Sequence, residues 1–215
     1  MKYSIFGTGV VGQTIGSKLI ANGHEVMMGS RSASNEKGMQ WVNNSAGKGK
    51  LGTFSDAAKF SDIIFNCVKG EMSLEVMKLA GEPNLKGKLI IDISNPLDFS
   101  KGMPPSLTVC NTDSVGEQIQ RNYPDSFVVK TLNTTNCQVM VNPSLVAGEH
   151  DLFLSGNDPE SKEKVRTILQ REFGWKNIID LGDITTARGV EMLLPIWVRL
   201  YGALKTPNFN FHIAK

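Results

Sequence analysis

The sequence predicts an α/β fold with a doubly wound, mostly parallel sheet, followed by a C-terminal helical extension. Strand-like and helix-like patterns alternate along the chain, as in successive βαβ units. Ile63–Val68 and Leu89–Ile93 are almost unbroken apolar runs, which is typical of parallel strands covered on both faces. A glycine motif at residues 7–12 separates the first strand from the first helix. Together these features indicate a Rossmann-type fold.

Five strands are expected in the first half of the chain. The first, Tyr3–Phe6, leads into a helix whose apolar residues Val11, Ile15 and Leu19 recur every four positions. A polar helix that contains Trp41 follows the second strand. The second to fifth strands are expected at His24–Met28, near Leu51–Phe54, at Ile63–Val68 and at Leu89–Ile93.

The second half continues the alternation and ends in a long helix. Further strands are expected at Phe127–Leu132, Asp151–Leu154 and Ile178–Asp180, with a helix at Glu160–Phe173. Thr185–Leu204 has the pattern of a final helix that Pro195 should kink. A length of 215 residues suits one domain, so we expect residues 1–215 to form it, with 184–215 as a C-terminal helix and tail.

One long stretch, Ser94 to about Val109, has no regular pattern and contains three prolines. Loops longer than about 12 residues are uncommon in compact domains and often serve function. The stretch is therefore either a lid or substrate loop, or a plain surface loop.

Composition excludes several classes of partner and site. The chain has 23 Lys and Arg against 21 Asp and Glu, a net charge of +2, so neither a nucleic acid nor a membrane surface is expected as a partner. Cys67, Cys110 and Cys137 form no CxxC pair, and no metal site or disulfide framework is expected. No secretory-signal pattern or membrane-length apolar run is present, and a cytoplasmic protein is expected.

Residues 7–12, Gly-Thr-Gly-Val-Val-Gly, match GxGxxG in the context that a dinucleotide site requires. Gly7 permits a tight turn, Gly9 lets the backbone approach a pyrophosphate, and Gly12 lets the helix pack closely on the strand. The helix N-terminus supplies free N–H groups for phosphates. The alternative is a glycine turn without a ligand. Residues 47–52 are also glycine-rich but lack the Lys-Ser or Lys-Thr of a P-loop, which disfavours a kinase or ATPase.

The end of the second strand favours NADP(H) over NAD(H). NAD enzymes place a carboxylate there for the ribose 2′-hydroxyl, and none occurs between Glu25 and Glu36. Ser30 and Arg31 would instead donate hydrogen bonds to a 2′-phosphate, and Lys37 would add positive charge.

Other candidate residues follow the fourth, fifth and sixth strands, where ligands of open α/β sheets bind. Asn95 either contacts the ligand or only caps the backbone, and Lys69 is either an acid or a solvated lysine. The full set of expected cofactor-binding residues is Gly7, Thr8, Gly9, Val10, Val11, Gly12, Ser30, Arg31, Lys37, Val68, Lys69, Ser94, Asn95 and Asn133.

No residue is identified as catalytic. His24 and His150 precede strands and are expected at the far edge of a parallel sheet, while His212 lies in the tail. The shortage of proton donors suits hydride transfer to a flavin-like ring, in which the positioning of two flat rings carries most of the catalysis.

Six segments spread over nearly the whole chain carry a resemblance to a known family: Gly29–Arg31, Ile91–Pro96, Val128–Asn133, Leu154–Asp158, Asp180–Asp183 and Ala187–Glu191. On these segments the chain resembles the coenzyme F420 (deazaflavin)-dependent NADP reductase family, and is similar to the cytosolic oxidoreductase domain of STEAP-like metalloreductases. The resemblance implies that Thr8–Val11, Ser30 and Arg31 bind NADP(H), and that the small-molecule acceptor is coenzyme F420 or a flavin. Val68–Glu71 and Asn133–Asn136 depart from the family pattern at the expected acceptor site.

Two other functions stay open on sequence grounds, a reductase of a small carbonyl or imine and a non-catalytic NADP(H) sensor. A homodimer whose C-terminal segment helps to build the acceptor site is also expected, because the final helix is apolar around much of its circumference and a second subunit would cover the surplus. The alternative is a helix that folds back at Pro195 and buries both sides within one subunit.

Overall fold

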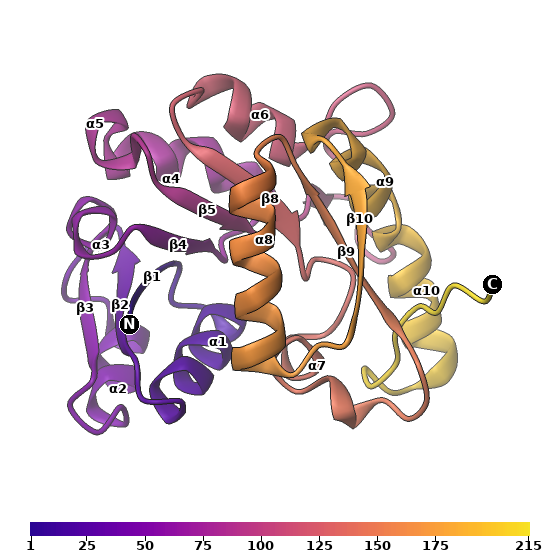
Figure 1. Cartoon of the computed structure of the whole chain (residues 1–215), viewed down its shortest axis with the longest axis horizontal. Coiled ribbons are helices and arrows are strands. Elements are labelled where there is room, and N and C mark those ends of the chain that lie inside the picture. The colour runs from indigo at the N-terminus through magenta and orange to yellow at the C-terminus, as the bar shows by residue number, and fades with distance from the viewer.

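A computed structural model describes residues 1–215 and shows one eight-stranded sheet with helices on both faces (Figure 1). The strand order is β10-β9-β8-β5-β4-β1-β2-β3. The expected α/β fold with a doubly wound, mostly parallel sheet is confirmed. The strands are β1 Lys2–Phe6, β2 Glu25–Ser30, β3 Gly49–Thr53, β4 Ile63–Asn66, β5 Leu89–Asp92, β8 Phe127–Thr131, β9 Asp151–Gly156 and β10 Asn177–Gly182.

Two hydrophobic clusters, one on each face, explain why the central strands are apolar throughout. Every residue of β4 and β5 is buried, because successive side chains point into opposite clusters. One cluster receives α1 Val10–Ala21, α2 Glu36–Asn43, α7 Cys137–Val141 and α8 Pro159–Ile168. The other receives α3 Phe54–Phe60, α4 Ser73–Ala80, α5 Glu82–Leu85 and α6 Val115–Asn122.

The last two strands, β9 and β10, run in the opposite direction to the other six. β9 runs antiparallel to β8, and β10 runs parallel to β9. Between β8 and β9 the only α-helix is α7, whose five residues span about 7.5 Å at 1.5 Å per residue. The five residues of β8 span about 16 Å, so α7 is too short to return the chain to the other edge of the sheet. β9 therefore starts at the edge where β8 ends.

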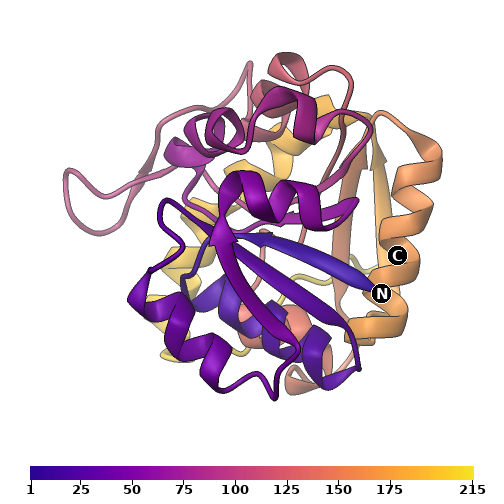
Figure 2. The same cartoon turned by 90° about the vertical axis from the view of Figure 1, so that its left-hand side faces the viewer.

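The irregular stretch after β5 forms a small hairpin. β6 Leu97–Asp98 pairs antiparallel with β7 Ser106–Leu107. The hairpin loop extends away from the body of the protein (Figure 2). Phe99 and Met103, 50% and 67% exposed, lie in this loop.

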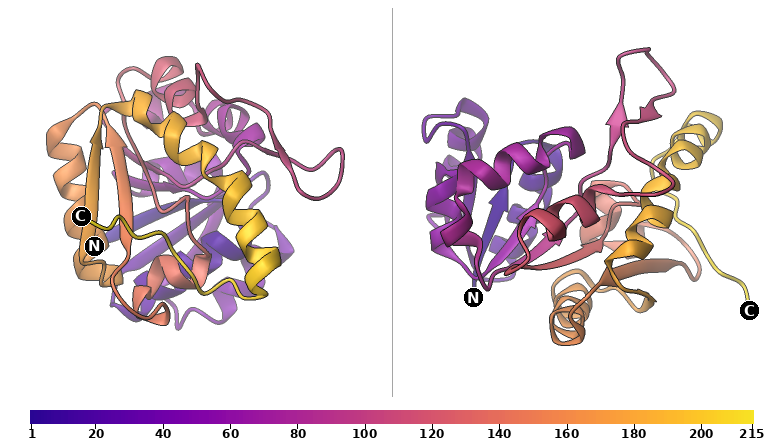
Figure 3. Two further views of the ribbon diagram at one scale, coloured as in Figure 1. Left: turned by 90° about the vertical axis from the view of Figure 1, so that its right-hand side faces the viewer. Right: turned by 90° about the horizontal axis from the view of Figure 1, so that it is seen from above.

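The expected final helix is divided in two. α9 Ala187–Met192 and α10 Leu194–Leu204 meet at Leu193, and Pro195 stands in the first turn of α10, where a missing N–H is tolerated. After α10 the chain crosses back toward β9 (Figure 3), where Asp151 N donates a hydrogen bond to Phe211 O at 2.9 Å. None of the helices combines the length and apolar content that crossing a bilayer requires.

Candidate functional site

Two adjoining pockets lie along the edge where β1, β2, β4, β5 and β8 end. The first, the Arg31 pocket, has a volume of about 370 Å³ and contains Gly7, Thr8, Ser30 and Arg31. The second, the strand-end pocket, has a volume of about 340 Å³. Val68 lines both. Seven of the expected residues line the strand-end pocket: Val10, Val11, Val68, Lys69, Ser94, Asn95 and Asn133.

The glycine motif has a different geometry at each glycine. Gly7 has φ +111°, a conformation that other residues rarely adopt. A Cβ added to Gly12 would lie 2.4 Å from Gly7 O, so this glycine is needed for close helix packing. Gly9 has φ −76°, and a Cβ there would meet no atom within 4 Å. No side chain caps the N-terminus of α1, which begins just after Gly9. The open space and free helix terminus fit a pyrophosphate.

Arg31 is exposed at the end of β2 and lies within 4 Å of no carboxylate. Arg31 therefore forms no ion pair on this chain, and its guanidinium is free to bind an anion. Ser30 is buried, and its hydroxyl donates to Ser32 O. Lys37 lies on the exposed first turn of α2 and lines neither pocket. Glu75 from α4 also lines the Arg31 pocket, and sequence reasoning missed it because α4 follows a different strand.

Two asparagines join the ends of β5 and β8 at the strand-end pocket. Asn95 Nδ2 donates to Asn133 O, and Asn133 Nδ2 donates to Asn95 Oδ1, both at 2.9 Å. Asn133 Nδ2 also lies 3.1 Å from Val190 O. Asn95 thus bonds a side chain as well as the backbone. Lys69, whose side chain is 75% exposed, lies at the rim, 3.8 Å from Glu71.

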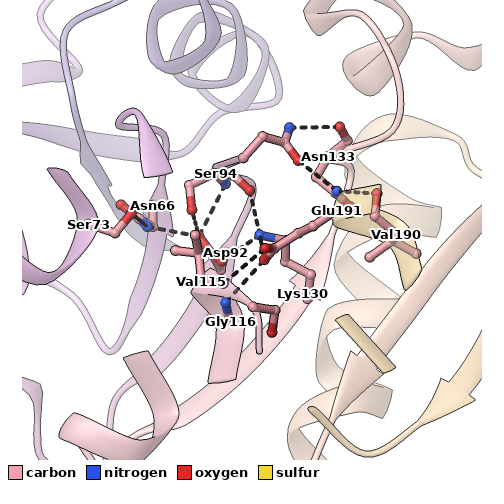
Figure 4. A network of polar contacts seen from close by, with 12 residues as sticks. Asn66, Ser73, Asp92, Ser94, Val115, Gly116, Lys130, Asn133, Val190 and Glu191 are labelled. Carbon is pink, nitrogen blue, oxygen red and sulfur yellow. Dashed lines mark hydrogen bonds and ion pairs between the residues drawn. The ribbon is translucent and has the colours of Figure 1, made fainter. Parts of the chain in front are cut away.

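Behind the strand-end pocket lies a buried ion cluster (Figure 4) that the sequence analysis did not identify. Lys130 Nζ lies 2.8 Å from Asp92 Oδ2 and 2.7 Å from Glu191 Oε1. Burial alone would lower the pKa of Lys130, but the charges and hydrogen bonds of Asp92 and Glu191 outweigh it and raise that pKa. The available signal was a charge inside each of two apolar strands, β5 and β8.

The C-terminal segment closes the remaining side of the strand-end pocket. Leu194 and Trp197 of α10 line it together with Cys137 and Met140 from α7. The Trp197 ring stacks between Tyr201, at 5.8 Å and 11°, and Phe209 of the tail, at 5.2 Å and 25°. The sequence predicts that the C-terminal segment helps to build the acceptor site, but it does not identify which residues of α10 line the pocket, because periodicity does not say which strand end a helix covers.

None of the three histidines lines the strand-end pocket. His24 lies before β2 and pairs with Glu172 at 2.8 Å. The expectation that His150 lies at the far edge is wrong, because β9 is antiparallel to β8 and begins at the edge where β8 ends. His150 Nε2 lies 3.0 Å from Pro143 O, and the ring packs against Trp175, outside the pocket.

Comparison with known proteins shows the family of the chain that holds these pockets. The family model described as NADP oxidoreductase coenzyme F420-dependent matches residues 2–96. A solved structure from Arthrobacter sp. FB24, provisionally named an F420-dependent NADP-reductase, is 48% identical, with 100% of each chain covered and a TM-score of 0.95. The chain belongs to the coenzyme F420-dependent NADP oxidoreductase family. As a member of it, the protein is an NADP-dependent oxidoreductase.

Two further relatives extend the comparison. Metalloreductase STEAP3 of Rattus norvegicus is 26% identical over 204 residues, which cover 91% of this chain and 38% of that protein. The chain thus spans about two fifths of the metalloreductase. An imine reductase from Streptomyces aurantiacus, at 16% identity and a TM-score of 0.66, covers 95% of this chain and shares the fold; 64% of that reductase is matched.

Proposed function

We propose that the protein transfers hydride between NADPH and a deazaflavin or flavin-type ring, coenzyme F420 or a flavin. The observation that carries the proposal is the chemistry of the strand-end pocket. Eleven of its 17 lining residues are hydrophobic, and no Asp, Glu, His or Tyr lines it. Burial, with a contribution from the Asp92 charge, raises the pKa of the Cys67 thiol in its wall and makes this thiol a poor acid. Such a pocket orients flat rings better than it donates protons.

Each pocket would bind a different part of NADPH, the Arg31 pocket its 2′-phosphate end and the strand-end pocket its nicotinamide. Arg31 would hold the 2′-phosphate. Ser30, whose hydroxyl donates to Ser32 O, stays a predicted second donor, and Lys37 at the exposed start of α2 stays a predicted additional charge. The space beside Gly9 and the N-terminus of α1 would receive the pyrophosphate. Val68, Ser94 and Asn95 would orient the nicotinamide. When bound, NADPH supplies a hydride and becomes NADP⁺, while the acceptor ring gains that hydride and takes one proton from solvent.

The acceptor ring would lie on the opposite side of the same pocket. Leu194 and Trp197 form this acceptor wall, and the amide of Asn133, which is hydrogen-bonded to Asn95, joins it to the nicotinamide side of the pocket. The apolar surfaces would exclude water from the transferred hydride, and the amide would fix one edge of the ring.

A panel of acceptors tests this proposal. We expect the protein to oxidise NADPH when coenzyme F420 or riboflavin is the acceptor, and not when the acceptor is a small carbonyl or imine compound under the same conditions. With NADH in place of NADPH, we expect little reaction. NADPH and acceptor consumption are followed separately by absorbance. Selective reduction of a carbonyl or imine would replace the proposal with that alternative, in which the rim residue Lys69 is the candidate acid. NADPH binding without turnover of any acceptor would favour a sensor.

The exposed side of α10 supports the proposal that the protein is a homodimer. Ile196, Tyr201 and Leu204 are 51%, 46% and 52% exposed, so the helix does not bury both sides within one subunit. Such a surface is well suited to a second copy of the chain.

Removing the residues after Thr206 tests both roles of this segment. The truncation deletes Phe209, which stacks on Trp197, and the tail contacts to Asp151, among them the 2.7 Å bond from Ile213 N. We expect slower acceptor turnover, a weaker dimer by sedimentation, and unchanged NADPH affinity, because the Arg31 pocket lies elsewhere. A monomeric intact protein at micromolar concentration would contradict the dimer. Unchanged turnover would contradict the role of the tail.

A further inference from the structure

Three charged side chains that contact no bulk solvent meet behind the strand-end pocket (Figure 4). Asp92, Lys130 and Glu191 come from β5, β8 and α9, and their side chains are at most 2% exposed. Lys130 directs its three hydrogen-bond donors to Asp92, to Glu191 and to the carbonyl oxygen of Ser94. The ammonium group is therefore fully satisfied.

Both carboxylates have further donors around them. Glu191 accepts hydrogen bonds from Val115 N at 2.9 Å and Gly116 N at 3.2 Å, at the start of α6. Asp92 Oδ1 accepts from Asn66 Nδ2 at 2.8 Å, from Ser94 Oγ at 2.7 Å and from Ser94 N at 3.1 Å. Every one of these contacts offers a proton to the carboxylate, as the ionised form requires.

A cluster of this kind is poorly explained by stability alone. Removing three charged groups from water costs free energy that their attraction only partly returns, and apolar side chains of similar volume often stabilise a core as well or better. What the cluster adds is a fixed arrangement of secondary-structure elements, since each of its bonds holds one element in place relative to another.

The elements fixed in this way are the two walls of the strand-end pocket. Ser94 is held at its N–H by Asp92 and at its carbonyl by Lys130, and both Ser94 and Asn95 line the pocket. On the other side, Glu191 lies three residues before Leu194 and six before Trp197, which form the acceptor wall. The bond from Asn133 Nδ2 to Val190 O is a second link, between the segment that follows β8 and α9.

We propose that Lys130 and Glu191 are positioning residues that set the separation between the nicotinamide wall and the acceptor wall of the strand-end pocket. The inference rests on the proposed function in so far as hydride transfer takes place in this pocket. Transfer requires the reacting atoms to approach to about 3–3.5 Å, and a displacement of about 1 Å can slow a reaction about 100-fold. Loosening α9 would therefore slow the transfer step more than it weakens NADPH binding.

The matched test compares Glu191→Gln with Glu117→Gln. Glu117 is also buried, and it also joins α6 to α9, through Arg188 Nε at 2.8 Å, but it contacts neither Lys130 nor the pocket. The Glu191→Gln substitution would place an amide N–H where only donors surround the side chain. We expect both variants to lose thermal stability and to keep NADPH affinity within about threefold, because neither alters the glycine loop or Arg31.

The distinguishing readout is single-turnover reduction of coenzyme F420 by NADPH and by 4-deuterated NADPH. We expect Glu191→Gln to slow the single-turnover transfer about 10- to 100-fold, and Glu117→Gln to stay within about twofold of the wild type. In steady-state assays of Glu191→Gln the isotope effect on kcat should rise, with little change in KM. An equal slowing in both variants would overturn the positioning role. Glu191→Asp keeps the charge, shortens the side chain and should also slow transfer. It replaces Glu191→Gln if that variant does not fold.

Amide hydrogen exchange tests the same inference without an acceptor. Glu191→Gln should raise exchange in peptides that cover residues 94–97 and 194–197, and Glu117→Gln should not. A wild-type protein that does not reduce coenzyme F420 would refute the proposed function, while this exchange pattern would still support the link between the walls. Equal exchange in the two variants would refute the link.

Discussion

Gly9→Val is expected to abolish the binding of NADPH while the fold stays intact. The backbone at Gly9 has φ −76°, which valine adopts without strain, and the added Cβ meets no protein atom within 4 Å. The substitution therefore fills only the space proposed for the pyrophosphate. We expect NADPH affinity to fall by about 100-fold or more, equivalent to about 2.8 kcal/mol at 1.4 kcal/mol per tenfold. Fluorescence titration measures the affinity, and circular dichroism and Tm report the fold.

Gly12→Val is the contrasting control. A Cβ at Gly12 would stand 2.4 Å from Gly7 O and 3.1 Å from an Ile5 methyl group, so strand and helix must separate. Overpacking of this kind costs about 1–3 kcal/mol, and Tm should fall by about 2–12 °C. Normal NADPH titration by Gly9→Val would show that no pyrophosphate lies beside this glycine. A fall in Tm for Gly9→Val as large as for Gly12→Val would show that its role is structural.

Arg31→Ala is expected to convert a preference for NADPH into indifference. Arg31 has no carboxylate partner on the chain, so its removal breaks no ion pair and should leave Tm unchanged. A charged hydrogen bond to the 2′-phosphate is worth about 1.5–3 kcal/mol, and NADPH affinity should fall about ten- to hundredfold. NADH, which lacks this phosphate, should bind as it does to the wild type.

Lys37→Ala distinguishes the contributions that Lys37 and Arg31, the two positive charges near the end of β2, make to NADPH binding. Lys37 lies outside the Arg31 pocket, and we expect its loss to weaken NADPH binding by less than about threefold at physiological salt, because exposed charges are screened. The measurement is a titration with both cofactors at two salt concentrations. Equal losses for NADPH and NADH in Arg31→Ala would contradict the assignment of the 2′-phosphate.

Local sequence patterns predicted most of the fold and those parts of the site that lie in the glycine motif and at the ends of the parallel strands. Apolar runs such as Ile63–Val68 identified buried strands because a strand covered on both faces has no polar alternation. The GxGxxG motif and the missing carboxylate after β2 located the Arg31 pocket, since both depend on residues close together in the chain. The carboxyl ends of parallel strands meet at one edge, which is why Val68, Asn95 and Asn133 were found together.

Other features depended on contacts between segments far apart in the sequence. The antiparallel direction of β9 follows from the short connection through α7, which no propensity reveals, and it moved His150 to the opposite edge. Asp92 and Lys130 were visible as charges within apolar strands, but their third partner, Glu191, lies 61 residues beyond Lys130.

The sequence by itself thus determined the α/β class, the nucleotide motif and the preference for NADP(H), because each is written in neighbouring residues or in a period along one element. Only the tertiary structure decided how α10 closes the strand-end pocket and which charges meet behind it. The physical reason is that helix periodicity states which face is apolar but not which surface covers it, and a buried charge is tolerated only where folding brings its partners.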